Sequence, residues 1–262
     1  MIALADKRYV KVQYKSSKNL QTRIQLHERF SVNQYDWFLW VFDQFKLPAV
    51  CRVLEVGCGT GRLWKDNLAR IPAGWQITLS DFSAGMLERA KNNLDGAVSG
   101  QFEFKTLDVE QIPLPDESYD AVIANHMLYH VPNRAQALRE IHRILKPGGK
   151  LYAATTGIDH LNELYDLIHQ VAPSANFLDH EFLLENGEEQ LAACFGQVML
   201  HPYEDGLVVT EVEPLLAYIL SGRFFEEAQD KVDDLTQLIE RGIDAQGAIH
   251  ITKSIGMFEA QK

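Results

Sequence analysis

The segment VLEVGCGTGRLW, residues 53–64, is the part of the sequence best suited to chemistry. It places Glu55 near the end of a β-branched run and then repeats glycine at alternate positions, Gly57, Gly59 and Gly61. Alternating glycines remove three side chains from one short turn, which lets a ligand come close to the backbone. A packed core has no need of this pattern, so the segment predicts a ligand-binding turn.

Three polar residues stand at the ends of later β-rich runs, namely Asp81, Asp108 and Asn125. Ligands of open α/β sheets bind at the carboxyl ends of parallel strands, so these side chains should share one edge with the glycine turn. Asp81 lies 24 positions after Gly57, where a carboxylate can accept hydrogen bonds from both hydroxyls of a ribose. Each residue alone is an ordinary strand terminator or helix cap. Together with the glycines they predict one nucleoside-sized site.

The spacing of the glycines argues against NAD. A dinucleotide fingerprint reads G-x-G-x-x-G, and the position of its third glycine is occupied here by Arg62. The spacing is instead G-x-G-x-G, which disfavours a pyrophosphate cradle. An NAD-dependent oxidoreductase is therefore the least favoured enzyme class.

Between residues 50 and 156 the chain alternates short β-rich runs with amphipathic helices, which predicts an α/β fold with a parallel sheet and helical crossovers. One helix is expected to begin at the cap Ser83, and another at about residue 134 should end at KPGG, residues 146–149. The expected strands are 52–56, 76–80, 102–107, 120–125 and 150–155.

The N-terminal segment has a different character. Ser31 and Gln34 have the spacing of a capping box, which predicts a helix over about 32–46. That helix is rich in aromatic residues and apolar nearly all round, so we expect it to be buried against the sheet or under a cap.

After residue 156 the pattern loosens. Two helices between the last two expected strands have the character of an insertion that helps to cover a pocket. The expected elements are helices at 159–171 and 179–194, a strand within 197–210, helices from 214–221 and over 226–241, and a closing strand at 248–260.

Composition narrows the function classes. The 262 residues carry a formal net charge of −11, which works against a broad nucleic-acid footprint. The densest apolar stretch, residues 37–42, is far too short to cross a bilayer, and the N-terminus lacks the apolar run of a signal peptide. Three cysteines without a metal-binding spacing suit a reducing compartment. We therefore expect a cytoplasmic protein with no membrane span, no metal site and no nucleic-acid partner.

Four stretches resemble successive motifs of class I S-adenosylmethionine-dependent methyltransferases: VLEVGCGTG, LSDFSAGML, LDVEQIPLPDESYDAVIANHMLYHV and LREIHRILKPGGKLY. The closest similarity is to the small-molecule branch that includes ubiquinone and menaquinone C-methyltransferases, and it covers about residues 50–156. The resemblance implies a doubly wound, mostly parallel seven-stranded sheet, the Rossmann-like methyltransferase fold. It also implies an N-terminal helical cap, residues 1–48, and a methyltransferase domain, residues 49–262, with a helical insertion at 211–242 before the last strand.

The resemblance assigns cofactor roles at matching positions. Glu55 and the loop Gly57–Gly61 should lie along the methionine part of S-adenosylmethionine, and Asp81 should hold the ribose hydroxyls. The remaining contacts are implied for Phe82 and Met86 beside the adenine, Asp108 and the backbone of Val109 at the adenine amino group, and Asn125 at the sulfonium.

Candidates for a catalytic base or an acceptor-orienting group are His126, Tyr129 and His130, just after the fourth strand. A structural role is the alternative for His130. Arg23 and His27 are candidates for the cofactor carboxylate if the N-terminal segment caps the site, and a solvated surface charge is the alternative for Arg23.

The resemblance does not identify the methyl acceptor. Five aromatic residues suit a flat or apolar acceptor and suit a hydrophobic core equally well: Trp37, Trp40, Tyr203, Phe224 and Phe225. The favoured function is methyl transfer to a small organic acceptor by in-line displacement. The alternatives are an RNA or protein methyltransferase and a non-catalytic S-adenosylmethionine-binding module.

Overall fold

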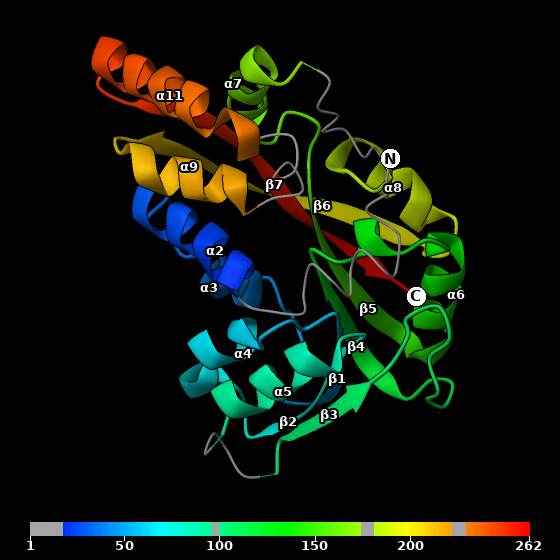
Figure 1. The fold of residues 1–262 in the computed structure, drawn as a ribbon. Helices are drawn as coiled ribbons and strands as arrows, with labels where there is room; N and C mark the ends of the chain where they lie inside the picture. Colours follow the sequence, from blue (N-terminus) through cyan, green and yellow to red (C-terminus); the bar gives the residue numbers. More distant parts are fainter. Residues whose placement is uncertain (1–17, 96–99, 174–180, 222–228) are drawn as a thin grey trace.

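The computed structural model describes residues 18–95, 100–173, 181–221 and 229–262. The described strands form one seven-stranded sheet in the order β3-β2-β1-β4-β5-β7-β6, with β7 antiparallel to both of its neighbours and the other pairs parallel (Figure 1). The expected α/β class and mostly parallel sheet are confirmed. The strands are β1 (Val50–Val56), β2 (Gly74–Asp81), β3 (Phe102–Thr106), β4 (Tyr119–Asn125), β5 (Leu145–Thr156), β6 (Gln197–Val209) and β7 (Ile249–Gln261).

Nine α-helices are seen within the described residues. They are α2 (Lys18–Phe30), α3 (Trp37–Asp43), α4 (Arg62–Asp66), α5 (Ala84–Asn93), α6 (Arg134–Ile144), α7 (Asn162–Val171), α8 (Leu184–Ala192), α9 (Val212–Leu220) and α11 (Val232–Gln246). Short 3-10 helices lie at Leu68–Arg70, Leu128–His130 and Gln229–Lys231.

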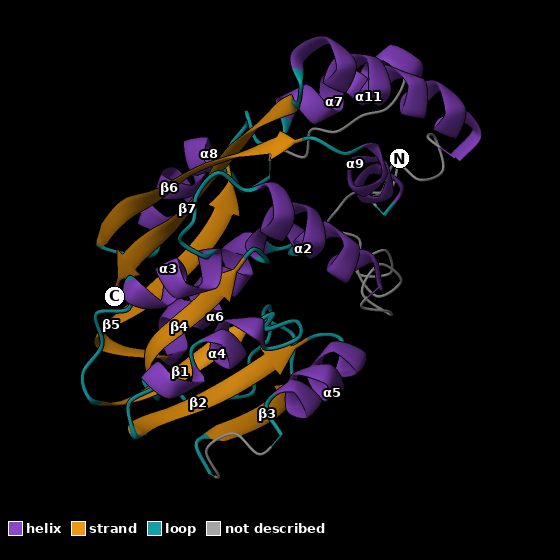
Figure 2. Ribbon diagram, turned by 90° about the vertical axis from the view of Figure 1, so that its left-hand side faces the viewer, coloured by secondary structure: helices purple, strands orange, loops and turns teal. Residues whose placement is uncertain are grey.

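Helices cover both faces of the sheet (Figure 2). Side chains alternate along β1, because successive residues of a strand point to opposite faces. Val53 belongs to the core under α3, α4 and α5, whereas Leu54 and Val56 belong to the core under α6 and α8. The result is the doubly wound arrangement expected from the sequence.

A third core lies beyond the main sheet. The long hairpin of β6 and β7 carries Leu207 and Ile251 into a cluster with α2, α7, α9 and α11, which gather around the far end of the hairpin (Figure 1). Helices α9 and α11 lie between β6 and β7 in the chain, as predicted for the insertion, and α11 continues to Gln246. This group brings α2 next to the carboxyl ends of the parallel strands.

The start of the aromatic helix was predicted wrongly. Helix α3 begins at Trp37, and its cap is Asp36, whose Oδ1 accepts hydrogen bonds from the backbone N–H groups of Phe38 (2.7 Å) and Leu39 (3.2 Å). Ser31 does not cap a helix, because residues 31–32 pair with β6 and the Ser31 hydroxyl donates to Asp205. Asp36 fits the cap better because its carboxylate reaches two orphan N–H groups at once.

The end of the helix at 134 also differs from the prediction. Helix α6 stops at Ile144, and the KPGG segment, 146–149, lies within β5 instead of closing the helix. Residues preceding a proline avoid the helical region, so the chain leaves the helix before Pro147. The predicted cap at Ser83 is confirmed, since its side chain accepts from the N–H of Met86.

Candidate active site

A cavity of about 680 Å³ lies at the carboxyl ends of β1, β2 and β4. Loops after these strands contribute one part of its wall, and α2, α3, α9 and the β6–β7 hairpin contribute the rest. The cavity brings together these residues singled out in the sequence: Arg23, His27, Trp37, Glu55, Gly57, Gly59, Asp81, Phe82, Met86, Asp108, Val109, Asn125, His126, Tyr129, His130 and Tyr203. Gly61 and Trp40 lie outside its lining, and Phe224 and Phe225 lie outside the described residues.

The three glycines of the turn have positive φ but three different surroundings. A Cβ on Gly59 (φ 54°) would meet no atom within 4 Å, so this position opens onto free space. A Cβ on Gly57 would lie 2.8 Å from Cβ of Met127, and one on Gly61 would lie 3.2 Å from Cβ of Ala90 in α5. The missing side chains of Gly57 and Gly61 thus make room for Met127 and for α5, and only Gly59 of the three opens onto free space, so a ligand is not needed to explain all three glycines.

Glu55 is buried at the root of the turn. Its Oε2 accepts a hydrogen bond of 2.6 Å from Nε1 of Trp64, a fully buried residue of α4. Burial raises the pKa of Glu55 to about 8, although the bond from Trp64 opposes this shift. The carboxyl group is thus largely protonated at neutral pH, and a cation placed beside it would favour its ionised form.

Asp81 closes the turn from the end of β2. Its Oδ2 accepts from the N–H of Gly59 (2.9 Å) and its Oδ1 from the N–H of Ser83 (2.7 Å). Burial raises the pKa of Asp81, and these two backbone hydrogen bonds oppose the shift. Each carboxylate oxygen has two acceptor positions, so one remains on each for a further donor.

Asp108 lies at the start of a tight turn after β3. Its Oδ1 accepts from the N–H of Glu110 (3.0 Å), and its carbonyl accepts from the N–H of Gln111 (3.0 Å). Val109 and Met86 are buried in the adjoining wall, and Phe82 also lines the cavity. These residues provide an apolar slot bounded by one carboxylate.

Asn125 ends β4 beside the turn, and His126 follows it. Oδ1 of Asn125 is buried and has no hydrogen-bond partner among the described residues. His126 has a positive φ of 53°, an uncommon conformation for a residue other than glycine, and its ring lies 5.1 Å from that of Trp37. Burial, with a smaller effect of Lys253, lowers the pKa of His126 to about 4, so its imidazole is neutral at pH 7.

His130 and Arg23 occupy different parts of the lining. His130 belongs to the 3-10 helix after β4, and its ring lies 4.5 Å from that of Tyr129. Arg23 of α2 donates from Nη2 to the carbonyl of Ser221 (2.7 Å), a contact that holds α2 against the end of α9.

Two further histidines of this wall are partly buried, with their rings shielded from water. Burial lowers the pKa of His27 to about 3 and that of His160 well below its ordinary value. The Nδ1 atoms of both rings and Nε1 of Trp37 lack a partner among the described residues. His160 was not predicted, because it lies in the loop after β5 in no recognisable motif and only the fold brings it to the cavity.

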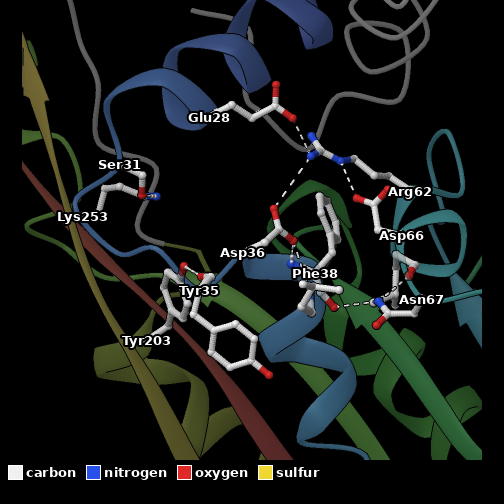
Figure 3. Close-up of polar contacts among 12 residues, drawn as sticks. Glu28, Ser31, Tyr35, Asp36, Phe38, Arg62, Asp66, Asn67, Tyr203 and Lys253 are labelled. Atoms are coloured by element: carbon white, nitrogen blue, oxygen red, sulfur yellow. Dashed lines mark hydrogen bonds and ion pairs between the residues drawn. The ribbon is translucent and has the colours of Figure 1, made fainter. Parts of the chain in front are cut away.

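Arg62 holds residues 28–38 beside the cavity through ion pairs (Figure 3). Its guanidinium pairs with Glu28 of α2 (2.5 Å), Asp66 of α4 (2.9 Å) and Asp36 (3.8 Å), and it lies over the ring of Phe38. Arg62, which occupies the third glycine position of the dinucleotide fingerprint, thus connects the glycine turn to residues 28–38.

A second set of contacts joins residues 31–35 to the β6–β7 hairpin (Figure 3). Lys253 pairs with Asp205, which also accepts from the hydroxyl of Ser31, and the Tyr203 hydroxyl donates to the carbonyl of Tyr35. Together with Arg62, these contacts hold residues 28–38 between the glycine turn and the hairpin.

Comparison with known proteins identifies the domain. Residues 54–153 match the family model described as "Methyltransferase domain". The ubiquinone/menaquinone biosynthesis C-methyltransferase UbiE of Pseudomonas savastanoi pv. phaseolicola is 39% identical over 163 residues, 62% of this chain and 63% of that protein. The first relatives of this kind are matched over only 45% to 63% of their own length.

Solved structures agree on the fold. Phosphoethanolamine N-methyltransferase 2 of Haemonchus contortus, in complex with S-adenosyl-L-methionine, superposes with a TM-score of 0.61 at 17% identity over 100% of this chain and 60% of that one. The [4+2]-cyclase SpnF shares the fold at a TM-score of 0.56 and 20% identity over 86% of this chain and 80% of that one, so the fold alone does not establish methyl transfer. The chain carries a class I S-adenosylmethionine-dependent methyltransferase domain that resembles UbiE, and S-adenosylmethionine is the cofactor of this class.

The residues present suit that cofactor. Gly59 leaves open space beside the backbone, Asp81 retains acceptor positions, and Asn125 has an unpartnered oxygen. No group of three or more His, Cys, Asp or Glu side chains is arranged to hold a metal ion within the part of the chain that the structure describes. In the same part, none of the helices has the length and apolarity needed to span a membrane.

Proposed function

We propose that the protein transfers a methyl group from S-adenosylmethionine to a small organic acceptor by in-line displacement. One observation carries this proposal: the glycine turn, the two strand-end acids and a second set of polar side chains outside the methyltransferase match all line the same cavity. The similarity to UbiE, a C-methyltransferase of ubiquinone and menaquinone biosynthesis, supports an acceptor that is a small molecule.

The chain's own residues would hold the cofactor along its length. Glu55 and the backbone at Gly59 would lie along the methionine part, with Arg23 and His27 near its carboxylate. Asp81 would accept from the ribose hydroxyls, Asp108 and Val109 would meet the adenine edge, and Phe82 and Met86 would cover its ring. When bound, S-adenosylmethionine supplies a methyl group that is electrophilic because it is attached to a sulfonium.

Positioning is then the main task of the protein. Holding an acceptor in line with the bond that breaks is worth roughly 7–11 kcal/mol of the barrier. Residues 28–38, which Arg62 and Lys253 hold in place and several of which line the cavity, would restrict the access of water to it. If the acceptor must lose a proton, His126 is the candidate base, because its neutral imidazole can accept one.

Calorimetric titration with S-adenosylhomocysteine tests this function, with NADH as the control ligand. We expect micromolar binding of the first and none of the second. Asp81→Ala should reduce the affinity about 10- to 100-fold, since a charge-assisted hydrogen bond contributes about 1.5–3 kcal/mol. Asp166→Ala, an exposed position on α7, is the matched control and should bind as the wild type does. Equal affinities in both variants would contradict the ribose assignment.

A further inference from the structure

Part of the cavity wall has no role in holding the cofactor in the proposed function. We name the four residues Trp37, His126, His160 and Tyr203 the acceptor cluster. The ring of Trp37 lies 5.1 Å from the rings of both His126 and Tyr203, and His160 lines the same cavity, near enough to His126 that a charge on His126 would lower the pKa of His160. Three of the four residues lie outside the methyltransferase match at 54–153.

The cluster contains polar atoms that the protein leaves without partners. Nε1 of Trp37 and Nδ1 of His160 are buried and make no hydrogen bond within the described residues. Nearly all buried polar groups of folded proteins are paired, and an unpaired one is destabilising. Both residues line the cavity, so a ligand bound there is the nearest source of the missing hydrogen-bond partners.

The cluster also lacks a free charge. Lys253, the cation beside it, is almost fully buried and is neutralised by Asp205, whose side chain is completely buried. His126 and His160 are neutral at pH 7 because burial disfavours their charged forms. Arg23, a further cation of the lining, is assigned to the cofactor carboxylate in the proposed function. A charged group placed against this cluster would lose its hydration without gaining a counter-ion.

We propose that the acceptor cluster selects an uncharged acceptor, whose hydroxyl, carbonyl or amide group hydrogen-bonds to Trp37 and His160. This inference rests on the proposed function, because it concerns the second substrate of the same cavity. The neutral imidazoles and the indole N–H supply both acceptors and donors. The two charges that act on Tyr203 are already paired, Lys253 with Asp205 and Asp36 with Arg62.

Binding of three matched probes to the protein saturated with S-adenosylhomocysteine tests the selection. Benzamide, benzoate and benzylamine share one ring and differ in charge. We expect benzamide to bind at least about tenfold more tightly than either charged probe at pH 7.5. Equal or tighter binding of benzoate or benzylamine, or no binding of benzamide at millimolar concentration, would overturn the proposal. Failure of S-adenosylhomocysteine itself to bind would instead refute the proposed function.

Variants of His160 separate recognition from folding. Asparagine keeps a polar atom near the position of Nδ1 and leucine does not, so His160→Leu should lower benzamide affinity about tenfold while His160→Asn retains most of it. Both should keep the wild-type affinity for S-adenosylhomocysteine. His250→Leu, an exposed position on β7, is the control and should change neither affinity. Equal losses in the Asn and Leu variants, or no loss in either, would contradict a hydrogen bond at this position.

Discussion

Glu55 offers a residue-scale test of the cofactor's orientation. Its pKa is raised from 4.5 to about 8 in the free protein, so its carboxyl group is still protonated at pH 7, where an ordinary glutamate is ionised. If the ammonium group of the methionine part binds beside it, the ionised form becomes favoured and the proton is released. We expect S-adenosylhomocysteine binding at pH 7 to release close to one proton.

Calorimetry in two buffers of different ionisation enthalpy measures this release. If one proton is released, the apparent binding enthalpies in phosphate and Tris should differ by roughly the difference between the ionisation enthalpies of the two buffers. Glu55→Gln keeps an acceptor for Nε1 of Trp64 and has no proton to lose, so its binding enthalpy should be nearly the same in both buffers. Identical wild-type enthalpies in the two buffers would place the ammonium group elsewhere.

Gly59 distinguishes a ligand-binding turn from a merely tight one. Asparagine tolerates positive φ better than other residues with a side chain, so Gly59→Asn should fold while its side chain enters the open space. We expect at least about tenfold weaker binding of S-adenosylhomocysteine, the equivalent of about 1.4 kcal/mol. Gly247→Asn provides the matched control, because Gly247 also has positive φ and open space but ends α11. A thermal melt checks that both variants fold, and normal binding by Gly59→Asn would mean that the cofactor passes elsewhere.

At the scale of elements, Arg62 controls how firmly α2 and the start of α3 close over the turn. Its planar guanidinium serves Glu28, Asp36 and Asp66 at once, which a lysine cannot reproduce. Each partly exposed pair contributes only about 0–1 kcal/mol, so the effect should be seen in dissociation of the ligand more than in folding.

We therefore expect Arg62→Ala and Arg62→Lys both to release S-adenosylhomocysteine several-fold faster in stopped-flow displacement. Arg139→Ala on α6 serves as the control, because its guanidinium contacts Gln136 on the outer surface of the same helix. Unchanged dissociation rates in the Arg62 variants would show that the N-terminal segment does not retain the ligand.

The elements differ in how well the sequence predicted them. The parallel strands carry β-branched, apolar runs that are buried on both faces, so β1 and β4 were found with small errors at their ends. The start of α3 was missed because Ser31 and Gln34 mimic a capping box, and the pairing of residues 31–32 with β6 is a contact distant in sequence. Local patterns predict local structure, whereas tertiary pairing decides between two available caps.

The same distinction applies to the site. Gly59, Asp81 and Asp108 were predicted because a parallel sheet brings consecutive strand ends to one edge. His160 was missed because it reaches the cavity only through the packing of the loop after β5. Gly61 was assigned to the ligand, yet its neighbour is α5, because spacing alone cannot tell which glycine faces free space.

At the scale of the whole molecule, the three partly buried histidines of the cavity wall should make stability depend on pH. The pKa values of His27 and His126 are lowered to about 3 and about 4, and that of His160 is also far below its ordinary value of about 6.5. Above pH 6.5 these three imidazoles are neutral in both the folded and the unfolded chain, so they do not lower the free energy of unfolding. The free energy of unfolding decreases as the pH falls below 6.5, because the unfolded chain then binds protons at these histidines and the folded chain does not.

Glu55 and Asp81 act in the opposite direction, because their pKa values are raised by burial. For such groups the folded chain holds the extra proton, so stability increases as the pH falls towards their unfolded values. Between pH 6 and pH 5 the three histidines should remove about 3–4 kcal/mol and Glu55 should restore about 1 kcal/mol. The net loss over this interval is therefore about 2–3 kcal/mol.

Urea unfolding at pH 7.5, 6 and 5 measures this balance. The free energy of unfolding should fall between the last two points, His160→Asn should flatten the decline by about 1 kcal/mol, and Glu55→Gln should steepen it by a similar amount. Ordinary carboxylates titrate mostly below this window, so they do not mask the effect. His250→Asn, at an exposed site on β7, should leave the slope unchanged. A wild-type stability that stays level or rises from pH 6 to pH 5 would mean that the histidines around the cavity are protonated in the folded protein, and the acceptor cluster would then carry positive charge.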